Sequence, residues 1–385
     1  MSKKLFFIDP MSYGTIASYD ENLLKGITAN NDNNLLITYF HSYLFPQKLP
    51  RDIKGNNVFR YNKLNNSLLK LLSYGSSLLK IIKHVLMEKP DLIHIQWIRV
   101  PLLDLAMLRF YKLFGGVVFY TAHNVLPHND NSNKTHRYYK RYYKNVDYII
   151  VHSDNTKQEL ILKFDLPEEK IMVIPHGILP VTCNRAEIQN EKNRLKETLG
   201  IKNQMILSCL GVQSKYKGTD ILIDAWKSSD ILCKSNRVLL IIAGKAKNID
   251  YEKLNEVDNV RIINEYISDE EYLALLQLSD FTILPYKEIS QSGSLLTAIN
   301  EYTPVLVSHV GGLYQPLEIA KIGWDFGFPN SENLSETIQT LISKEDEVES
   351  IKNAAEEWEK IHKYYSWNRI GKMTVEAYKS VINKE

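Results

Sequence analysis

The sequence predicts an α/β protein built from two doubly wound domains with parallel sheets. Short apolar runs alternate with amphipathic helical stretches along the whole chain, which is the pattern of parallel strands joined by crossover helices. The length of 385 residues is sufficient for two cores of ordinary domain size. A polar, irregular stretch at residues 181–195 separates the two halves and predicts a linker.

Each strand candidate is an apolar run that ends in small or polar residues. The first half contains runs at 4–9, 34–40, 91–97, 116–122, 147–153 and 170–177, and the second half at 205–211, 237–244, 259–265, 281–286 and 304–308. Residues 364–382 have helical spacing and predict a terminal helix. We therefore expect a first domain at 1–182, a second at 183–365, and a segment 366–385 that returns to the first domain.

Composition excludes several classes of protein. The three cysteines, Cys183, Cys209 and Cys233, lie far apart without CxxC spacing, which argues against a disulfide framework or a zinc site and favours a reducing compartment. No signal-peptide core and no apolar run of about 18 residues is present, so we expect a cytoplasmic protein. Residues 1–180 contain 23 Lys and Arg against 15 Asp and Glu, whereas the remainder contains 24 against 30, so the two halves are expected to face different partners.

Two stretches of the second half have the features of a phosphate site. Lys217 and Gly218 lie between a strand and an apolar helix, and a Ser-Gly turn at 290–294 precedes another helix. Cationic side chains and free backbone amides at a helix start bind diphosphates. We expect Lys217 to neutralise a departing diphosphate, with Lys215 as a second charge, although a solvated lysine and a plain structural turn are the alternatives.

Eight short segments, taken in chain order, resemble the sequence motifs of a known family. They lie at 121–130, 147–153, 170–177, 211–226, 265–286, 290–298, 304–313 and 364–367. Over nearly its whole length the chain resembles the family-4 (group 1) glycosyltransferases of the GT-B fold. The resemblance implies two Rossmann-like domains facing a cleft, with the acceptor site in the first and the donor site in the second. It also implies retaining, metal-independent transfer without a cofactor, from a UDP- or GDP-linked sugar.

The resemblance also implies which residues bind the donor. They are Gly211, Gln213, Gly218, Glu265, Tyr266, Ile267, Ser292, Gly293, Ser294 and Thr297. Many relatives have two glutamates in this region, but here the matching positions fall near Ile289 and on Thr297. The contacts to the donor are therefore expected to differ from those of relatives.

Residues on the acceptor side follow strands of the first half. The resemblance implies that His123 contacts the transferred sugar, and a mainly neutral histidine suits orientation of a hydroxyl better than nucleophilic attack. The acceptor-side candidates are Asp9, Tyr13, Gly14, Asn124 and His128. Asp9 is a candidate base for inverting transfer, and Asp130 is another; an Asp before Pro is otherwise a turn former.

Two basic stretches suggest other partners. Residues 63–89 form an amphipathic helix whose lysines could lie on an anionic membrane, with a core-packed helix as the alternative. Residues 136–145 are basic and tyrosine-rich, yet a solvated helix fits them better than nucleic-acid binding. No nucleic-acid partner is expected.

These observations predict a hexosyltransferase of surface polysaccharide synthesis. Its partners would be a nucleotide sugar and a glycan or polyprenyl-linked acceptor, and it would lie in the cytoplasm, peripheral to the inner face of the membrane. The alternatives are a catalytically silent scaffold with the same fold, an inverting transferase that uses Asp9, and a sugar-nucleotide epimerase of similar shape.

Overall fold

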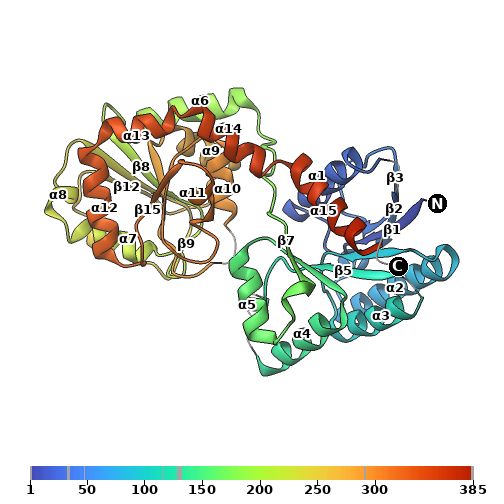
Figure 1. Ribbon diagram of the computed structural model, residues 1–385. Helices are drawn as coiled ribbons and strands as arrows, with labels where there is room; N and C mark the ends of the chain where they lie inside the picture. The colour runs from blue at the N-terminus through green and yellow to red at the C-terminus, as the bar shows by residue number, and fades with distance from the viewer. Residues whose placement is uncertain are drawn as a thin grey trace. The chain divides into compact units, whose positions relative to one another are not determined.

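The computed structural model divides the chain into two compact units (Figure 1). It describes residues 2–32, 35–46, 48–114, 116–127, 132–289 and 292–382. The first unit combines Met1–Leu179 with Tyr365–Glu385, and the second is Pro180–Tyr364. The chain thus leaves the first unit after Leu179, slightly before the expected boundary at 182, and returns to it at Tyr365.

The first unit is built on a seven-stranded parallel sheet with the order β3-β2-β1-β4-β5-β6-β7. Its strands are β1 (Lys3–Ile8), β2 (Leu35–Ser42), β3 (Ile53–Phe59), β4 (Leu92–Ile95), β5 (Val117–Thr121), β6 (Tyr148–Val151) and β7 (Ile171–Val173). Successive side chains of β1 are buried on opposite faces, because both faces are covered by helices. The strand order reverses between β1 and β4, where open sheets of this kind bind ligands at the carboxyl ends.

Helices cover both faces of this sheet. They are α1 (Thr15–Ala29), α2 (Ser67–Glu88), α3 (Pro101–Phe114), α4 (Asn133–Asn145), α5 (Asp154–Phe164) and the C-terminal α15 (Trp367–Ile382). Figure 1 shows α15 beside α1, at opposite ends of the colour scale. The two helices touch through glycines, since a Cβ atom at Gly371 would lie 2.0 Å from the carbonyl carbon of Gly26. This close approach completes the apolar layer that contains Leu23, Ile370 and Tyr378.

The second unit repeats the same design with a six-stranded parallel sheet, β12-β10-β8-β13-β14-β15. Its strands are β8 (Met205–Leu210), β10 (Val238–Ala243), β12 (Val260–Ile263), β13 (Phe281–Leu284), β14 (Val305–Val307) and β15 (Gly323–Asp325), and β9 (Gln213–Ser214) pairs with β11 (Ala246–Lys247). Its helices are α6 (Arg185–Thr198), α7 (Thr219–Lys227), α8 (Asp230–Cys233), α9 (Asp269–Leu278), α10 (Gly293–Asn300), α11 (Gln315–Ile319), α12 (Ser331–Ser343), α13 (Glu345–Lys352) and α14 (Ala355–Tyr364). The reversal of strand order lies between β8 and β13.

The predicted irregular linker at 181–195 is wrong, because most of it forms helix α6. The side chain of Asn184 caps this helix by accepting a hydrogen bond from the backbone N–H of Ala186 at 2.9 Å. Ile188 and Leu195 supply the buried side of the helix. Only two apolar positions in a polar helix are buried, which is why the stretch reads as a linker in the sequence.

Helix α2 is amphipathic as expected, but its buried side is narrower than its apolar side. Tyr74, Ser77, Leu78, Ile81 and Val85 are buried. The exposed apolar side chains are Leu68, Leu69, Leu71, Leu72, Leu79, Leu86 and Met87. One stripe of the helix is therefore packed in the core, as the alternative interpretation expected. A second apolar stripe lies on the surface.

Candidate active site

The loop after β8 lies at the reversal point of the second sheet and is shaped by glycines. Gly211 has φ +92°, and Gly244, after the neighbouring β10, has φ +128°. A Cβ atom at Gly244 would lie 2.0 Å from the carbonyl oxygen of Gly211. Gly218, with φ +72°, approaches the loop after β13 so closely that a Cβ atom would lie 1.8 Å from the oxygen of Pro285. Glycine alone fits at Gly218 and Gly244, where the backbone of a neighbouring loop approaches closely, and the positive φ of Gly211 also favours glycine.

Gln213 holds this loop in place. It is buried, and its Nε2 donates to the carbonyl oxygens of Gly211 at 2.8 Å and Cys209 at 3.0 Å. Its Oε1 accepts from the hydroxyl of Thr219 at 2.9 Å. Both ends of the carboxamide are thus used inside the protein, so the structure makes Gln213 a support of the site, whereas the sequence suggested a donor contact.

Lys217 brings the positive charge to this loop. Its Nζ lies 3.4 Å from where a Cβ atom of Gly211 would be, and 5.5 Å from the centre of the Tyr286 ring. No carboxylate of the described residues lies within 4.0 Å of Lys217 Nζ, whereas the nearby Lys287 pairs with Asp220 at 2.7 Å. Lys215 is exposed on the same loop and is likewise outside the ion pairs of the described chain. Lys217 is therefore a half-buried ammonium group that faces glycine backbone.

The start of α10 faces the same loop. Ser292 caps the helix by accepting from the backbone N–H of Leu295 at 3.2 Å, and Gly293 is exposed, with open space where a Cβ atom would lie. The Ser294 hydroxyl lies 4.0 Å from the Cβ position of Gly211, close to the half-buried Tyr272. Gly211, Lys217 and Ser294 are thus brought together. Ser290 and Gln291 lie outside the described residues.

Other expected donor residues lie farther along their elements. Thr297 donates its hydroxyl to the carbonyl oxygen of Gly293 at 2.9 Å, within α10. Glu265 and Tyr266 follow β12 and are exposed, Tyr266 by 84%, while Ile267 is buried. No described contact connects these three residues with Lys217, and their donor role stays a prediction.

Asp9 follows β1 at the reversal point of the first sheet but cannot serve as a base. Its side chain is fully buried, with Oδ1 accepting from the backbone N–H of Met11 at 2.6 Å. Asp9 Oδ2 and Asp20 Oδ1 are also buried, and neither has a hydrogen-bond partner among the described residues. Burial and the adjacent carboxyl of Asp20 raise the pKa of Asp9 well above its usual range, while burial raises the pKa of Asp20 to about 7. Asp9 therefore favours its neutral form beside Asp20, and the inverting alternative loses its expected base.

Tyr13 and Gly14 lead from β1 into α1. Tyr13 is half-buried, with its hydroxyl 3.6 Å from the sulfur of Met11. Gly14 is the N-cap of α1, with φ 58° and ψ −138° and no side-chain capping bond. A residue with a Cβ atom rarely adopts this conformation, which gives the glycine a backbone role.

His123 follows β5 and is held from three sides. Its ring stacks on that of Trp97 with centroids 4.8 Å apart and planes 5° apart. Its Nε2 lies 3.1 Å from the carboxamide of Gln96, and its Nδ1 lies 3.2 Å from Nε2 of His152. Burial, and then the neighbouring His152, lower the pKa of His123 well below its usual value. A neutral, oriented imidazole is what a sugar-contacting histidine needs.

The remaining acceptor-side candidates are less defined. The backbone oxygen of Asn124 accepts from the hydroxyl of Tyr143 at 3.3 Å. His128 and Asp130 lie outside the described residues. In the basic stretch at 136–145, Tyr142 and Tyr143 are fully buried, which removes them from any role in base stacking.

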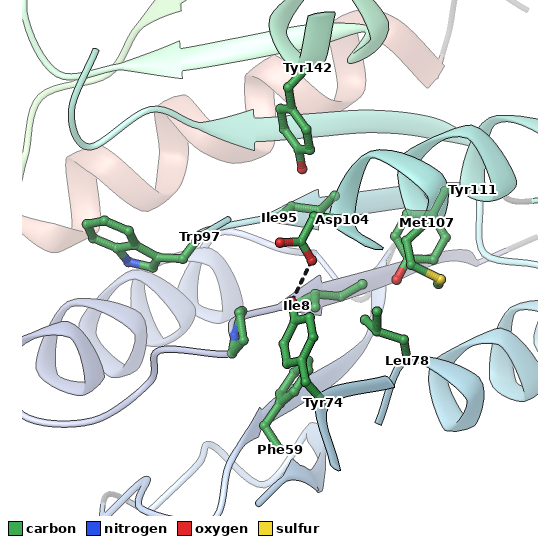
Figure 2. Close-up of a pocket in the computed structure, with 11 residues that line it drawn as sticks. Ile8, Phe59, Tyr74, Leu78, Ile95, Trp97, Asp104, Met107, Tyr111 and Tyr142 are labelled. Atoms are coloured by element: carbon green, nitrogen blue, oxygen red, sulfur yellow. Dashed lines mark hydrogen bonds between the residues drawn. The ribbon is translucent and has the colours of Figure 1, made fainter. Parts of the chain in front are cut away.

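Trp97 also borders a small cavity inside the first unit (Figure 2). The hydroxyl of Tyr74 donates to Asp104 at 2.6 Å across this cavity, and Tyr142 closes one side. A volume of about 20 Å³ is sufficient for roughly one water molecule. The cavity is therefore too small for a sugar or nucleotide.

The sequence analysis does not identify several residues that lie in the site. Gln96 and His152 follow β4 and β6, so their position after strands was a usable signal. Asp20 lies in the middle of α1 and gives no such signal. Within the described residues, no group of three or more His, Cys, Asp or Glu side chains is arranged to hold a metal ion.

Comparison with known proteins places this geometry in a family. The model of glycosyltransferase family 4 matches residues 21–180, and that of the glycosyl transferases group 1 matches residues 191–358. An uncharacterised glycosyltransferase of Methanocaldococcus jannaschii is 24% identical over 96% of this chain and 95% of its own length. The lipopolysaccharide glucosyltransferase WaaG of Escherichia coli is 27% identical over 46% of this chain and 48% of its own length.

Solved structures show the same fold. HepE of Anabaena, crystallised with UDP, superposes with a TM-score of 0.67 at 16% identity, over 98% of this chain and all of that one. Among the described helices none is both long and apolar enough to cross a bilayer. With two Rossmann-like parallel-sheet units and a family match in each, the chain has the GT-B fold and belongs to the group 1 glycosyltransferases of family 4.

Proposed function

We propose that this glycosyltransferase moves a hexose-type sugar from a UDP- or GDP-linked donor to a glycan or lipid-linked oligosaccharide in surface polysaccharide synthesis. The observation that carries the proposal is the meeting of Lys217, Gly211 and Ser294 at the reversal point of the second sheet. A lysine without a carboxylate partner, beside exposed backbone and a helix start, offers a diphosphate both charge and amide donors. The complex of HepE with UDP and the glucosyl transfer named for WaaG support the donor class and the pathway.

Lys217 would act most strongly as the sugar leaves. Cleavage of the bond between sugar and phosphate increases the negative charge on the diphosphate, and a preplaced ammonium group stabilises that charge in the transition state. Lys215 would add a second, more exposed charge. In this proposal the protein's own cations neutralise the leaving group, so turnover would not require a metal ion.

Retention of the anomeric configuration fits the acceptor side better than inversion. Inversion needs a carboxylate that removes the acceptor proton, and the expected base Asp9 is fully buried with a raised pKa. In a retaining reaction the departing diphosphate takes that proton. His123 would orient a hydroxyl of the transferred sugar or the acceptor. An NMR measurement of the product linkage with the donor's own anomeric configuration would agree, and the opposite configuration would overturn this part.

The surface of α2 supports a membrane-bound acceptor. The exposed leucines Leu68, Leu72, Leu79 and Leu86 recur at helical spacing and form a stripe. Lys80 and Lys83 are exposed beside this stripe and lie outside every ion pair of the described chain. An apolar stripe flanked by free lysines suits the surface of an anionic bilayer, where lipid-linked acceptors lie. We therefore propose peripheral binding at the inner face of the membrane.

Donor binding is the first test. The purified protein is heated with a panel of UDP- and GDP-linked hexoses, with and without EDTA, and the midpoint of thermal unfolding is measured. A ligand that binds only the native state raises this midpoint, and EDTA should not abolish the shift. The same panel is run on Lys217→Met, which should show a smaller shift. If no nucleotide sugar stabilises the wild-type protein, the proposed donor class is wrong.

A further inference from the structure

A chain of hydrogen bonds links the C-terminal helix to the carboxyl ends of four strands in the first unit. It runs from Tyr378 to His94, Gln96, His123, His152 and the backbone oxygen of Ile174, over successive distances of 2.5, 3.1, 3.1, 3.2 and 2.9 Å. The side chains of Tyr378, His94 and Gln96 have no exposed surface. His123 is the partly exposed member of the chain.

The imidazoles in this chain are neutral. Burial lowers the pKa of His94 and of His152 to about 3, and it lowers the pKa of His123 well below its usual value. A neutral imidazole has one N–H donor and one lone pair, so each ring must donate at one nitrogen and accept at the other.

The backbone oxygen of Ile174 decides which nitrogen carries each proton. A carbonyl oxygen can only accept, so His152 donates from Nδ1 and presents a lone pair at Nε2. His123 must then donate to it from Nδ1. The Nε2 atom of His123 is left with the lone pair, facing Gln96.

The side chain of Gln96 connects His123 with His94, and its orientation sets the direction of both hydrogen bonds. The coordinates place its Oε1 toward His123 and its Nε2 toward His94, an arrangement that would need a second proton on His123. The oxygen and the nitrogen of a carboxamide are nearly the same in shape. Rotating the carboxamide of Gln96 by 180° gives every contact in the chain of hydrogen bonds one donor and one acceptor. In that orientation Tyr378 donates to His94 Nδ1, and the proton on His94 Nε2 is shared between Gln96 at 3.1 Å and the hydroxyl of Thr121 at 2.7 Å. Gln96 in turn donates to His123 Nε2.

We infer that Gln96 and His152 are positioning residues that fix His123 as the Nδ1–H tautomer, so that its single lone pair lies at Nε2, where Gln96 donates in this structure and where a substrate hydroxyl would take the place of Gln96. A substrate hydroxyl can donate to this nitrogen but cannot accept from it. The assignment of the tautomer stands on the contacts and on the neutrality of the buried rings. Its consequence for substrate rests on the proposed function of His123.

Histidine nitrogen NMR tests the tautomer directly. The protein is labelled with ¹⁵N-histidine, and its signals are assigned with single His→Gln variants at 94, 123 and 152. At neutral pH we expect protons on Nδ1 of His123 and His152 and on Nε2 of His94. A proton on Nε2 of neutral His123 would overturn the inference. This measurement needs no substrate, so it is independent of whether the proposed function holds.

Two variants at position 96 test the positioning role. Gln96→Glu introduces a carboxylate that can only accept, so we expect it to draw a second proton onto His123, visible as an imidazolium signal. Gln96→Leu removes one hydrogen bond to His123, and we expect kcat to fall about five- to tenfold while the affinity for the nucleotide changes less than about twofold. Thermal unfolding of each variant confirms that it is folded. Unchanged kcat in folded Gln96→Leu together with an unchanged His123 signal in Gln96→Glu would show that Gln96 does not position His123. Absence of donor binding by the wild-type protein would instead refute the proposed function.

Discussion

The ammonium group of Lys217 lies 3.4 Å from the point that a Cβ atom on Gly211 would occupy. A cation and the backbone of a partly exposed glycine therefore lie side by side at the end of β8. The loop that presents both is held by the buried carboxamide of Gln213 and by the contact of Gly218 with Pro285. The first two predictions follow from this arrangement.

Gly211→Ala should weaken both donor binding and turnover. The new methyl group would enter the volume next to Lys217, and φ +92° is unfavourable for alanine. Gly200→Ala is the matched control, because Gly200 also has positive φ, +66°, but has open space around it in the turn after α6. Both variants should lose about 1 kcal/mol of stability, and only Gly211→Ala should lose donor affinity by calorimetry. Equal donor affinity in the two variants would contradict the assignment of this volume to the diphosphate.

Lys217→Met should lower turnover about a hundredfold, the typical effect of one lost transition-state contact. Lys215→Met should have a smaller effect, since Lys215 is exposed and its charge is more strongly screened. Lys227→Met serves as the control, because this exposed lysine lies at the far end of α7. The measurement is kcat for each folded variant. Near-wild-type turnover of Lys217→Met would remove the lysine from the mechanism.

Asp9→Asn should make the stability of the protein less dependent on pH. Asp9 and Asp20 bind protons more tightly in the folded chain than in the unfolded chain. The stabilising contribution of Asp20 is therefore complete below about pH 4 and is lost as the pH rises through about 7, and that of Asp9 is lost as the pH rises through its own raised pKa. The buried histidines act in the opposite sense, but only below about pH 6.5. An asparagine at position 9 can donate permanently to Asp20 and so stabilise its ionised form.

Urea unfolding between about pH 6.5 and pH 8.5 checks this prediction. The wild-type protein should lose about 1 kcal/mol more than Asp9→Asn over this range, in proportion to the change in protonation of Asp20. Asp165→Asn, at an exposed helix end, should behave as the wild type does. If Asp9→Asn and the wild type lose stability in parallel, the two carboxyls do not share a proton.

Reversing the charge of Lys80 and Lys83 to glutamate should weaken binding to vesicles that contain anionic lipid. Both lysines flank the exposed leucine stripe of α2 and are solvent-exposed, so the change should leave folding intact. Lys227→Glu with Lys360→Glu gives the same change in net charge on the second unit and should leave vesicle binding unchanged. Sedimentation with vesicles at increasing salt measures the effect, because salt screens surface attraction. Wild-type protein that fails to bind at low salt would contradict the membrane proposal.

The sequence predicts most strands because they are buried on both faces and read as continuous apolar runs. It misses β3, whose residues IKGNNVF form an edge strand with exposed polar side chains, and it misses the short β15. It also proposes Lys217 and His123 as site residues, because each comes after a strand and so lies at the carboxyl-end edge of its sheet. The protonation state of Asp9 could not be predicted from the sequence, because it depends on the neighbouring carboxyl of Asp20 in a different element. The same is true of the tautomer of His123, which is decided by a carbonyl oxygen after β7.

The return of the chain to its starting unit has a consequence for biosynthesis. Residues 1–179 leave the ribosome without α15, so the partners of Ile370, Val375 and Tyr378 stay uncovered while the second unit is translated. The intervening residues take about 10 to 40 seconds to make at ordinary elongation rates. We expect the second unit, a continuous segment, to reach its native state first, and the N-terminal residues to gain protease resistance in stalled nascent chains only after α15 has emerged. Folding order would then run opposite to the order of synthesis.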